Sequence, residues 1–122
     1  ATAREPHPKL FDEIAVAAVQ RQEEFTPQGV ANYLWAYATN GKVDEHLFSS
    51  MAHSVERLLG SFNGQELANV AWAYSVANVA APLVFNDAFV NACLTKEDEF
   101  KVESLSQLHQ WQLWQEELRF EI

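Results

Sequence analysis

Two stretches of thirteen residues in this chain are nearly the same. FTPQGVANYLWAY begins at Phe25, and FNGQELANVAWAY begins at Phe62, thirty-seven positions later. Seven of the thirteen positions are identical, and both stretches end in the same Trp-Ala-Tyr triplet. Internal similarity at a fixed period of about 20–50 residues is typical of repeat architectures, in which each unit buries its apolar face against its neighbours. The chain is therefore expected to fold as a stack of similar units.

Helix-start and helix-stop residues frame both copies. Thr26 followed by Pro27 is a typical start, and Asn40-Gly41 is a typical end, so a helix is predicted from about Pro27 to Thr39. In the second copy, Asn63 and Glu66 have the spacing of a capping box. With the apolar stripes between them, these signals predict an all-α fold of about six helices. We expect stacked helical-hairpin repeats, an α-α superhelix or solenoid, with a period of about 37–38 residues.

The same signals divide the chain into units. Asp44 is predicted to cap a helix that ends at Gly60, and Pro82 is predicted to begin another. At 122 residues the chain is expected to form one helical-repeat domain, residues 1–122. Because it begins with Ala1, we expect that either a leader has been removed or the chain is a segment of a longer protein. The predicted units are a half repeat (8–24), a first repeat (25–61), a second repeat (62–99) and a degenerate terminal repeat (100–122).

Charge is scarce on the two helices that carry the Trp-Ala-Tyr triplets, where Glu66 is the single charged residue. A helix that is apolar or small nearly all round is buried on more than one side. We therefore predict that these helices lie inside the stack and that Trp35 and Trp72 are equivalent, buried and one repeat apart. Replacing either tryptophan with Ala is then expected to cost about 3–5 kcal/mol. The predicted structural core of the repeat consists of Phe25, Trp35, Tyr37, Phe62, Trp72 and Tyr74.

Polar side chains recur beside these core residues. Amide groups can pair with the edges of nucleic-acid bases, and an aromatic ring such as that of Tyr33 can stack on a base. The alternative is that the amides bond to the backbone or to a neighbouring helix inside the stack, and we favour it for the two asparagines. The candidate ligand-facing or RNA-facing residues are Gln28, Asn32, Tyr33, Gln65 and Asn69.

Composition limits the kinds of partner. The chain has 8 Lys and Arg residues against 17 Asp and Glu residues, which gives a formal net charge of −9 at pH 7. Phosphate backbones are held by clustered cations, so these residues alone are poorly equipped to bind RNA. No run approaches the roughly 18–20 apolar residues of a transmembrane helix, so no membrane contact is expected.

Catalytic and metal-binding patterns are not found in the sequence. His46 and His53 are seven residues apart, whereas metal ligands on a helix are normally three or four apart, and His109 has no Cys or His nearby. Cys93 has no basic neighbour that would lower its pKa, so we interpret it as a small buried hydrophobe. No Gly-rich phosphate loop or nucleophile elbow is present. We predict a protein that is not an enzyme, with no cofactor and no metal site.

The unit F-x-x-Q-x-[LV]-A-N-x-x-W-A-Y resembles the octotricopeptide repeats and the related helical repeats of organellar proteins that carry a C-terminal RAP domain, among them the Fas-activated serine/threonine kinase-like proteins. The resemblance spans about residues 8–115 and is strongest over Phe25–Gly41 and Phe62–Asn78. It implies a location in chloroplasts or mitochondria and a role in RNA stability, processing or translation, with single-stranded RNA as the ligand of the full-length protein. The alternative is an acidic protein-interaction scaffold or structural subunit that does not contact RNA.

The last unit departs from the pattern. LSQLHQWQLWQEEL resembles a degenerate final repeat. Gln110-Trp111 occupies the positions that correspond to Trp72-Ala73, so the Trp-Ala pair is not kept. Trp111 and Trp114 do not fit one narrow apolar stripe together, so one of them is expected either to be exposed at the end of the chain or, as we prefer, to pack on a domain outside this segment.

Overall fold

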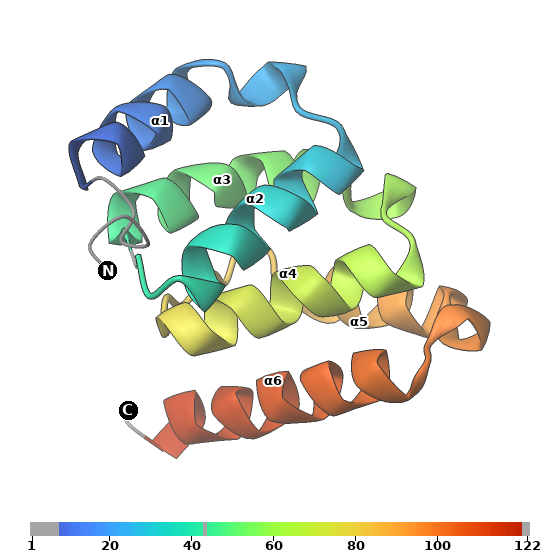
Figure 1. Cartoon of the computed structure of the whole chain (residues 1–122). Coiled ribbons are helices and arrows are strands. Elements are labelled where there is room, and N and C mark those ends of the chain that lie inside the picture. The colour runs from blue at the N-terminus through green and yellow to red at the C-terminus, as the bar shows by residue number, and fades with distance from the viewer. Residues whose placement is uncertain (1–7, 43, 121–122) are drawn as a thin grey trace.

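A computed structural model describes residues 8–42 and 44–120. Those residues form six α-helices and no strand, so the predicted all-α fold with about six helices is confirmed (Figure 1). Short 3-10 turns precede three of the helices: η2 (Gln22–Glu24), η3 (Leu59–Ser61) and η4 (Glu97–Glu99). The α-helices are α1 (Pro8–Gln20), α2 (Pro27–Thr39), α3 (Glu45–Arg57), α4 (Gly64–Ala77), α5 (Asp87–Thr95) and α6 (Val102–Phe120).

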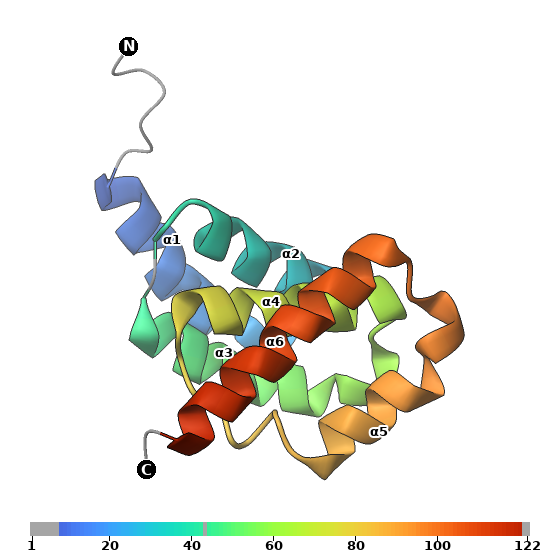
Figure 2. The same cartoon turned by 90° about the horizontal axis from the view of Figure 1, so that it is seen from below.

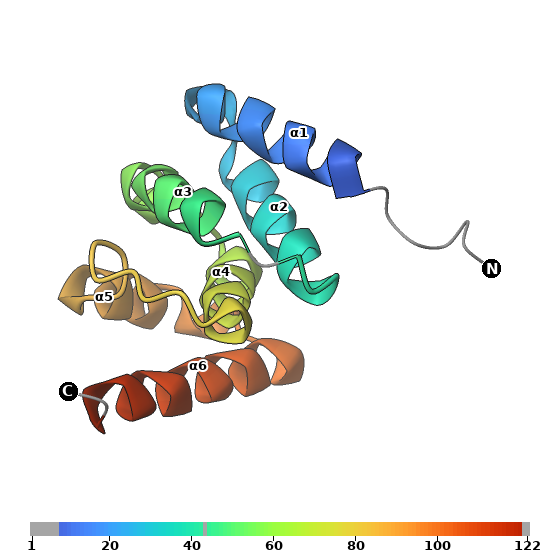
Figure 3. The same cartoon turned by 90° about the vertical axis from the view of Figure 1, so that its left-hand side faces the viewer.

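The helices pack as a stack of hairpins. The most extensive helix contacts join α2 to α4 and α4 to α6, while α3 contacts both α1 and α2. Figures 1 and 3 show α2, α4 and α6 following one another down the stack, with α3 and α5 on the other side of α4. Figure 2 shows that α6 crosses α4 at an angle. Because α4 is covered from several sides, its packing face is the most completely buried of the chain.

Local capping explains where the helices begin. Thr26 Oγ1 accepts a hydrogen bond from the main-chain N–H of Gly29 (3.1 Å), so α2 begins at Pro27 and spans the predicted residues. At α4 the predicted capping box is confirmed. The main-chain N–H of Glu66 donates to Asn63 Oδ1 (2.8 Å), and the main-chain N–H of Asn63 donates to Glu66 Oε1 (2.9 Å).

Two predicted helix boundaries are wrong. The helix predicted to begin at Pro82 begins at Asp87, because Asn86 Oδ1 accepts from the main-chain N–H groups of Ala88 and Phe89 and so caps α5. Residues 82–86 form turns before it. In addition, α3 ends at Arg57 rather than at Gly60, since the chain tightens there into η3.

One contact occurs twice in the core. Tyr37 Oη donates to the carbonyl oxygen of Phe11 (2.8 Å), and Tyr74 Oη donates to that of Phe48 (2.6 Å), thirty-seven positions further along. Both pairs of rings also meet edge to face, with centroids 5.1 Å apart. The first contact joins α2 to α1 and the second joins α4 to α3. The core between the two sides of the stack is built around such rings, with Tyr74, Phe48, Phe62 and Phe89 fully buried.

Candidate functional site

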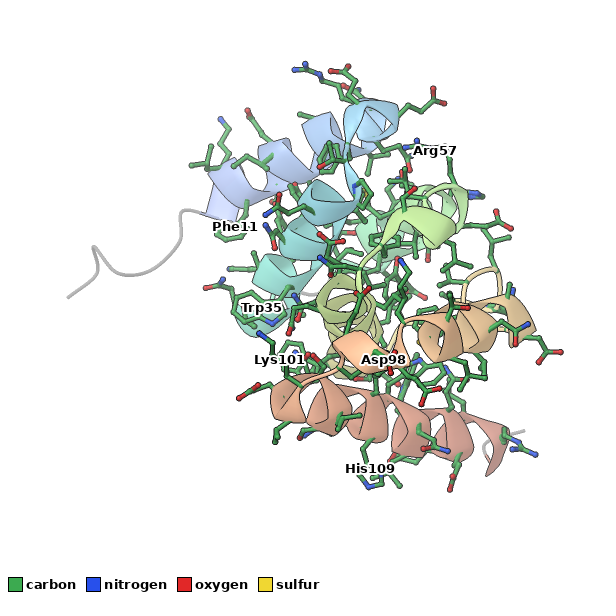
Figure 4. All side chains as sticks on the ribbon, turned by 90° about the vertical axis from the view of Figure 1, so that its right-hand side faces the viewer. Phe11, Trp35, Arg57, Asp98, Lys101 and His109 are labelled. Atoms are coloured by element: carbon green, nitrogen blue, oxygen red, sulfur yellow. The ribbon has the colours of Figure 1, made fainter. Side chains whose placement is uncertain are left out.

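One side of α2 is left uncovered by the other helices of residues 8–42 and 44–120. Gln28, Asn32, Trp35 and Thr39 are all exposed, and their spacing of four, three and four residues places them on a single side of the helix. The exposed fraction of Trp35 is 41%, which is unusual for so large an apolar side chain. Figure 4 shows Trp35 at the edge of the molecule, on the same side as Lys101.

The corresponding side of α4 carries the same kinds of residue at the same spacing. Gln65 and Val76 are exposed, and Asn69 and Trp72 are half-buried. We call the surface made by these two sides the open face. Its members are Gln28, Asn32, Trp35 and Thr39 from α2, and Gln65, Asn69, Trp72 and Val76 from α4.

The two tryptophans meet on the open face. The ring centroids of Trp35 and Trp72 are 6.3 Å apart, and the ring planes are tilted by 35°. Trp72 Nε1–H donates a hydrogen bond of 3.1 Å to Oε1 of Gln110 on α6. Side chains from α2, α4 and α6 therefore form one continuous row, Trp35–Trp72–Gln110, along the stack.

The prediction that Trp35 is buried is wrong, whereas Trp72 is half-buried and packs against the hydrophobic core. The buried stripe of α2 consists of Val30, Ala31, Leu34, Tyr37 and Ala38, and a residue directly after Leu34 is turned about 100° out of that stripe. Trp35 is one turn from Asn32 and two turns from Gln28, so helical spacing places it with the exposed amides. The exposure of Trp35 is therefore indicated by its helical spacing and not by its residue type.

Tyr33 does not belong to the open face. Its ring stacks on that of Tyr37 (centroids 4.8 Å apart, planes 16° apart) and meets Phe25 edge to face at 5.6 Å. Its hydroxyl donates to Tyr37 Oη (3.3 Å), and burial together with this hydrogen bond raises the pKa of Tyr33. Tyr37 thus covers one face of the Tyr33 ring, which places Tyr33 in this aromatic cluster rather than beside the exposed amides. Phe25 is half-buried in the same cluster, whereas Tyr37, Phe62 and Tyr74 are buried.

The four candidate amides differ in their hydrogen-bond partners within the chain. Gln65 Nε2 donates to Asn69 Oδ1 (2.9 Å), and the hydroxyl of Ser104 donates to Gln65 Oε1 (3.0 Å). The amides of α4 are thus partly used within the stack. Those of Gln28 and Asn32 have no side-chain hydrogen bond to another described residue, so their donors and acceptors are available to a ligand.

The open face contains no Lys or Arg, and four of the described cations interact with groups elsewhere. Neither α2 nor α4 contains Lys or Arg. Arg21 pairs with Glu24 (2.9 Å), Lys96 donates to the carbonyl oxygen of Phe62 (2.7 Å), and Arg57 donates to that of Gln22 (3.3 Å). Lys42 lies over the ring of Phe11, with its ammonium 5.6 Å from the centroid. The two helices that form the open face therefore offer no cation to a phosphate backbone.

The other polar groups do not assemble a reactive site. A hollow of about 420 Å³ lies between α1 and the start of α3, where Asp12, Asp44, Glu45 and His46 line it beside Lys42. Among residues 8–42 and 44–120, no group of three or more His, Cys, Asp and Glu side chains is placed to hold a metal ion. Cys93 is half-buried, and this burial raises the pKa of its thiol to about 11.

The residue that sequence reasoning overlooked is Gln110. Gln110 lies thirty-eight positions after Trp72 and accepts a hydrogen bond from it. This spacing, close to one repeat period, is the sequence feature that could have indicated the contact.

The part of the chain that the structure describes contains no helix both long and apolar enough to span a bilayer. No family model matches the chain, and no significant match is found among curated proteins or solved structures.

Proposed function

We propose that this chain is a non-catalytic helical-repeat binding module whose open face receives an extended ligand. The observation that carries this proposal is the Trp35–Trp72 pair, which lies in contact on the uncharged faces of α2 and α4 and beside amide side chains. Tryptophan is one of the residues that most often dominate binding energy, because a rigid indole buries a large area at little cost in conformational entropy. An indole that the core does not cover is therefore best explained by a ligand.

The resemblance of the repeats assigns this module to an organellar protein of RNA metabolism, in a chloroplast or a mitochondrion. Within such a protein we assign the open face to a polypeptide partner rather than to the RNA itself. The reason is the lack of cations on α2 and α4, together with the net charge of −9. A single-stranded RNA needs a positively charged groove as well as stacking platforms. Fractionating the source cells and probing with an antibody against this chain tests the organellar location.

Two random pools test the binding function. The purified chain and its Trp35→Ala/Trp72→Ala variant are exposed in parallel to a pool of single-stranded RNA at about 50 mM salt and to a displayed library of random peptides. We expect the peptide library to yield ligands that bind the parent and lose affinity for the variant, and the RNA pool to yield none in the sub-micromolar range. The proposal fails if neither pool contains a ligand whose binding depends on the two indoles.

A further inference from the structure

We propose that the ligand of the open face is an extended, basic peptide segment of a partner protein. Its Lys or Arg side chains lie on the indoles of Trp35 and Trp72, and its main chain bonds to the neighbouring amides. This inference rests on the proposed binding function and adds the chemistry of the partner. It is carried by three observations: the spacing of the rings, the amides with open donors and acceptors, and the exposed carboxylates on the Gln110 side of α6.

The ring spacing fits an extended chain. In a β-strand, side chains at positions i and i+2 project to the same side and are separated by about 6.6–6.8 Å. The centroids of Trp35 and Trp72 are 6.3 Å apart. Two alternate side chains of a strand that runs from α2 towards α6 therefore each meet one indole. The hydrogen bond from Trp72 to Gln110 fixes that ring before any ligand arrives, which lowers the entropic cost of binding.

The amides suit a peptide main chain. Each amide side chain offers both a carbonyl acceptor and an NH₂ donor, the complements of a peptide N–H and C=O. Gln28 and Asn32 lie two turns and one turn before Trp35 on the exposed side of α2. Asn32 is thus placed to bond to the backbone of a strand whose side chain covers the Trp35 ring, whereas Gln28 lies about 10 Å from Trp35 along α2.

Two exposed carboxylates lie on the Gln110 side of α6. Glu103 and Glu117 lie seven residues before and after Gln110, so each is two turns, or about 10 Å, from it along the helix. A Lys or Arg held over an indole is attracted by the ring, and these carboxylates add to the negative potential around it. Lys101, directly before α6, is a cation on the same side of the molecule as Trp35 (Figure 4). The net charge of −9 adds a long-range attraction for a cationic segment.

Fluorescence anisotropy with three labelled probes tests the proposal at about 50 mM salt. The probes are a ten-residue peptide that alternates Lys with Ser, a matched peptide that alternates Glu with Ser, and a ten-nucleotide oligouridylate. We expect the Lys-Ser peptide to bind at least tenfold more tightly than the other two. Trp35→Ala should weaken it by roughly two- to fivefold, the effect of one exposed cation–π contact, and Trp35→Tyr should retain most of the affinity.

Charge variants distinguish binding at the open face from attraction by the overall negative charge of the chain. Glu103→Gln/Glu117→Gln removes the two carboxylates on the Gln110 side of α6. Glu97→Gln/Asp98→Asn removes the same charge from η4, which is exposed and which Figure 4 shows away from Trp35. We expect the first variant to weaken the Lys-Ser peptide several-fold more than the second. Lys101→Gln should strengthen it.

Two kinds of result would overturn the proposed basic peptide ligand. Equal weakening by the two charge variants, or no effect of Trp35→Ala, would overturn the proposal, because binding would then reflect net charge alone. Indole-dependent binding of the oligouridylate or of the Glu-Ser peptide would overturn the basic partner while leaving the open face a binding surface. Circular dichroism of every variant shows that the fold is retained.

Discussion

The hydroxyl of Tyr74 donates a 2.6 Å hydrogen bond to the main-chain carbonyl oxygen of Phe48, and both residues are fully buried. This contact joins α4 to α3 at the centre of the core. Tyr37 makes the same contact with Phe11 between α2 and α1, but nearer to the end of the stack. The two tyrosines therefore form a matched pair for measuring how much such a bond contributes at the centre and at the edge.

Tyr74→Phe removes the donor and leaves the ring. We expect the free energy of unfolding to fall by about 0.5–1.5 kcal/mol, the usual contribution of one hydrogen bond. Tyr37→Phe should cost less, although it also breaks the bond that Tyr33 donates, because its site is nearer the surface and water can replace the lost partners. Urea unfolding of the three proteins measures both differences. A larger loss for Tyr37→Phe would contradict the central role assigned to α4.

The same tyrosine predicts a pH dependence. Burial raises the pKa of Tyr74 above its ordinary value, so the folded chain keeps this proton at pH values where the unfolded chain has lost it. The stability is then fully present below about pH 10, the unfolded pKa, and falls as the pH rises above it. Thermal melts of the parent between about pH 8 and 11 should show this decline, and Tyr74→Phe should make it shallower. A parent stability that stays constant across that range would contradict the prediction.

Trp35→Ala should cost far less stability than the sequence alone suggested. Because the ring is exposed on the open face, we expect a loss of at most about 1–2 kcal/mol. Phe62→Ala serves as the buried control, since Phe62 is fully buried and its truncation should cost about 3–5 kcal/mol. Denaturant unfolding measures both. Equal losses for the two variants would mean that Trp35 is packed in solution.

Gly64 is expected to tolerate no side chain. A Cβ built there would lie 2.8 Å from Cβ of Glu99 and 3.2 Å from Cδ1 of Phe100, and the Gly64 N–H donates to Glu99 Oε1 (2.7 Å). Gly64→Ala should therefore push η4 away and cost about 1–3 kcal/mol. Gly60 is the control, because no other group lies within 4 Å of a Cβ at that position. Gly60→Ala should change the melting temperature little, and a similar drop in both variants would count against the close contact at Gly64.

Trp114 and Trp111 should respond differently to replacement by Phe. Trp114 Nε1–H donates to Asn78 Oδ1 (2.8 Å), whereas Trp111 Nε1–H is buried without a partner among the described residues. Trp114→Phe thus breaks a hydrogen bond, and we expect a loss of about 1–2 kcal/mol. Trp111→Phe removes an unsatisfied donor, which offsets much of the lost packing, so its effect should be smaller. Calorimetric melts that rank the two variants in the opposite order would refute this explanation.

Most of the fold was predictable because its signals are local. Thr26 and Asn63 cap the helices that follow them, and each helix needs only residues within a few positions to begin there. The start of α5 was missed because Pro82 and Asn86 both suit a helix start, and the choice depends on the turns between them. The 37-residue repeat period itself stays a prediction from sequence, although the Tyr37 and Tyr74 hydrogen bonds recur at that interval.

The candidate site was harder to predict because exposure depends on the whole stack. Whether a helix face is covered is decided by other helices, so the local pattern around Trp35 could not show that its side stays open. The terminal unit posed the same difficulty. Trp111 and Trp114 were not expected to be covered together, yet Trp114 is buried and Trp111 half-buried. Asn78, in a left-handed conformation at the end of α4, provides the acceptor that Trp114 reaches.

The contact between Trp35 and Trp72 also gives the chain a built-in optical signal. Two indole chromophores whose centroids are 6.3 Å apart are close enough for their electronic transitions to couple, and the sign and size of the resulting circular dichroism depend on the angle between them. One ring belongs to α2 and the other to α4. Sliding of one helix against the other, or a ligand bound on the rings, would therefore change the circular dichroism spectrum of the unlabelled protein. The spectrum thus reports on the packing of α2 against α4.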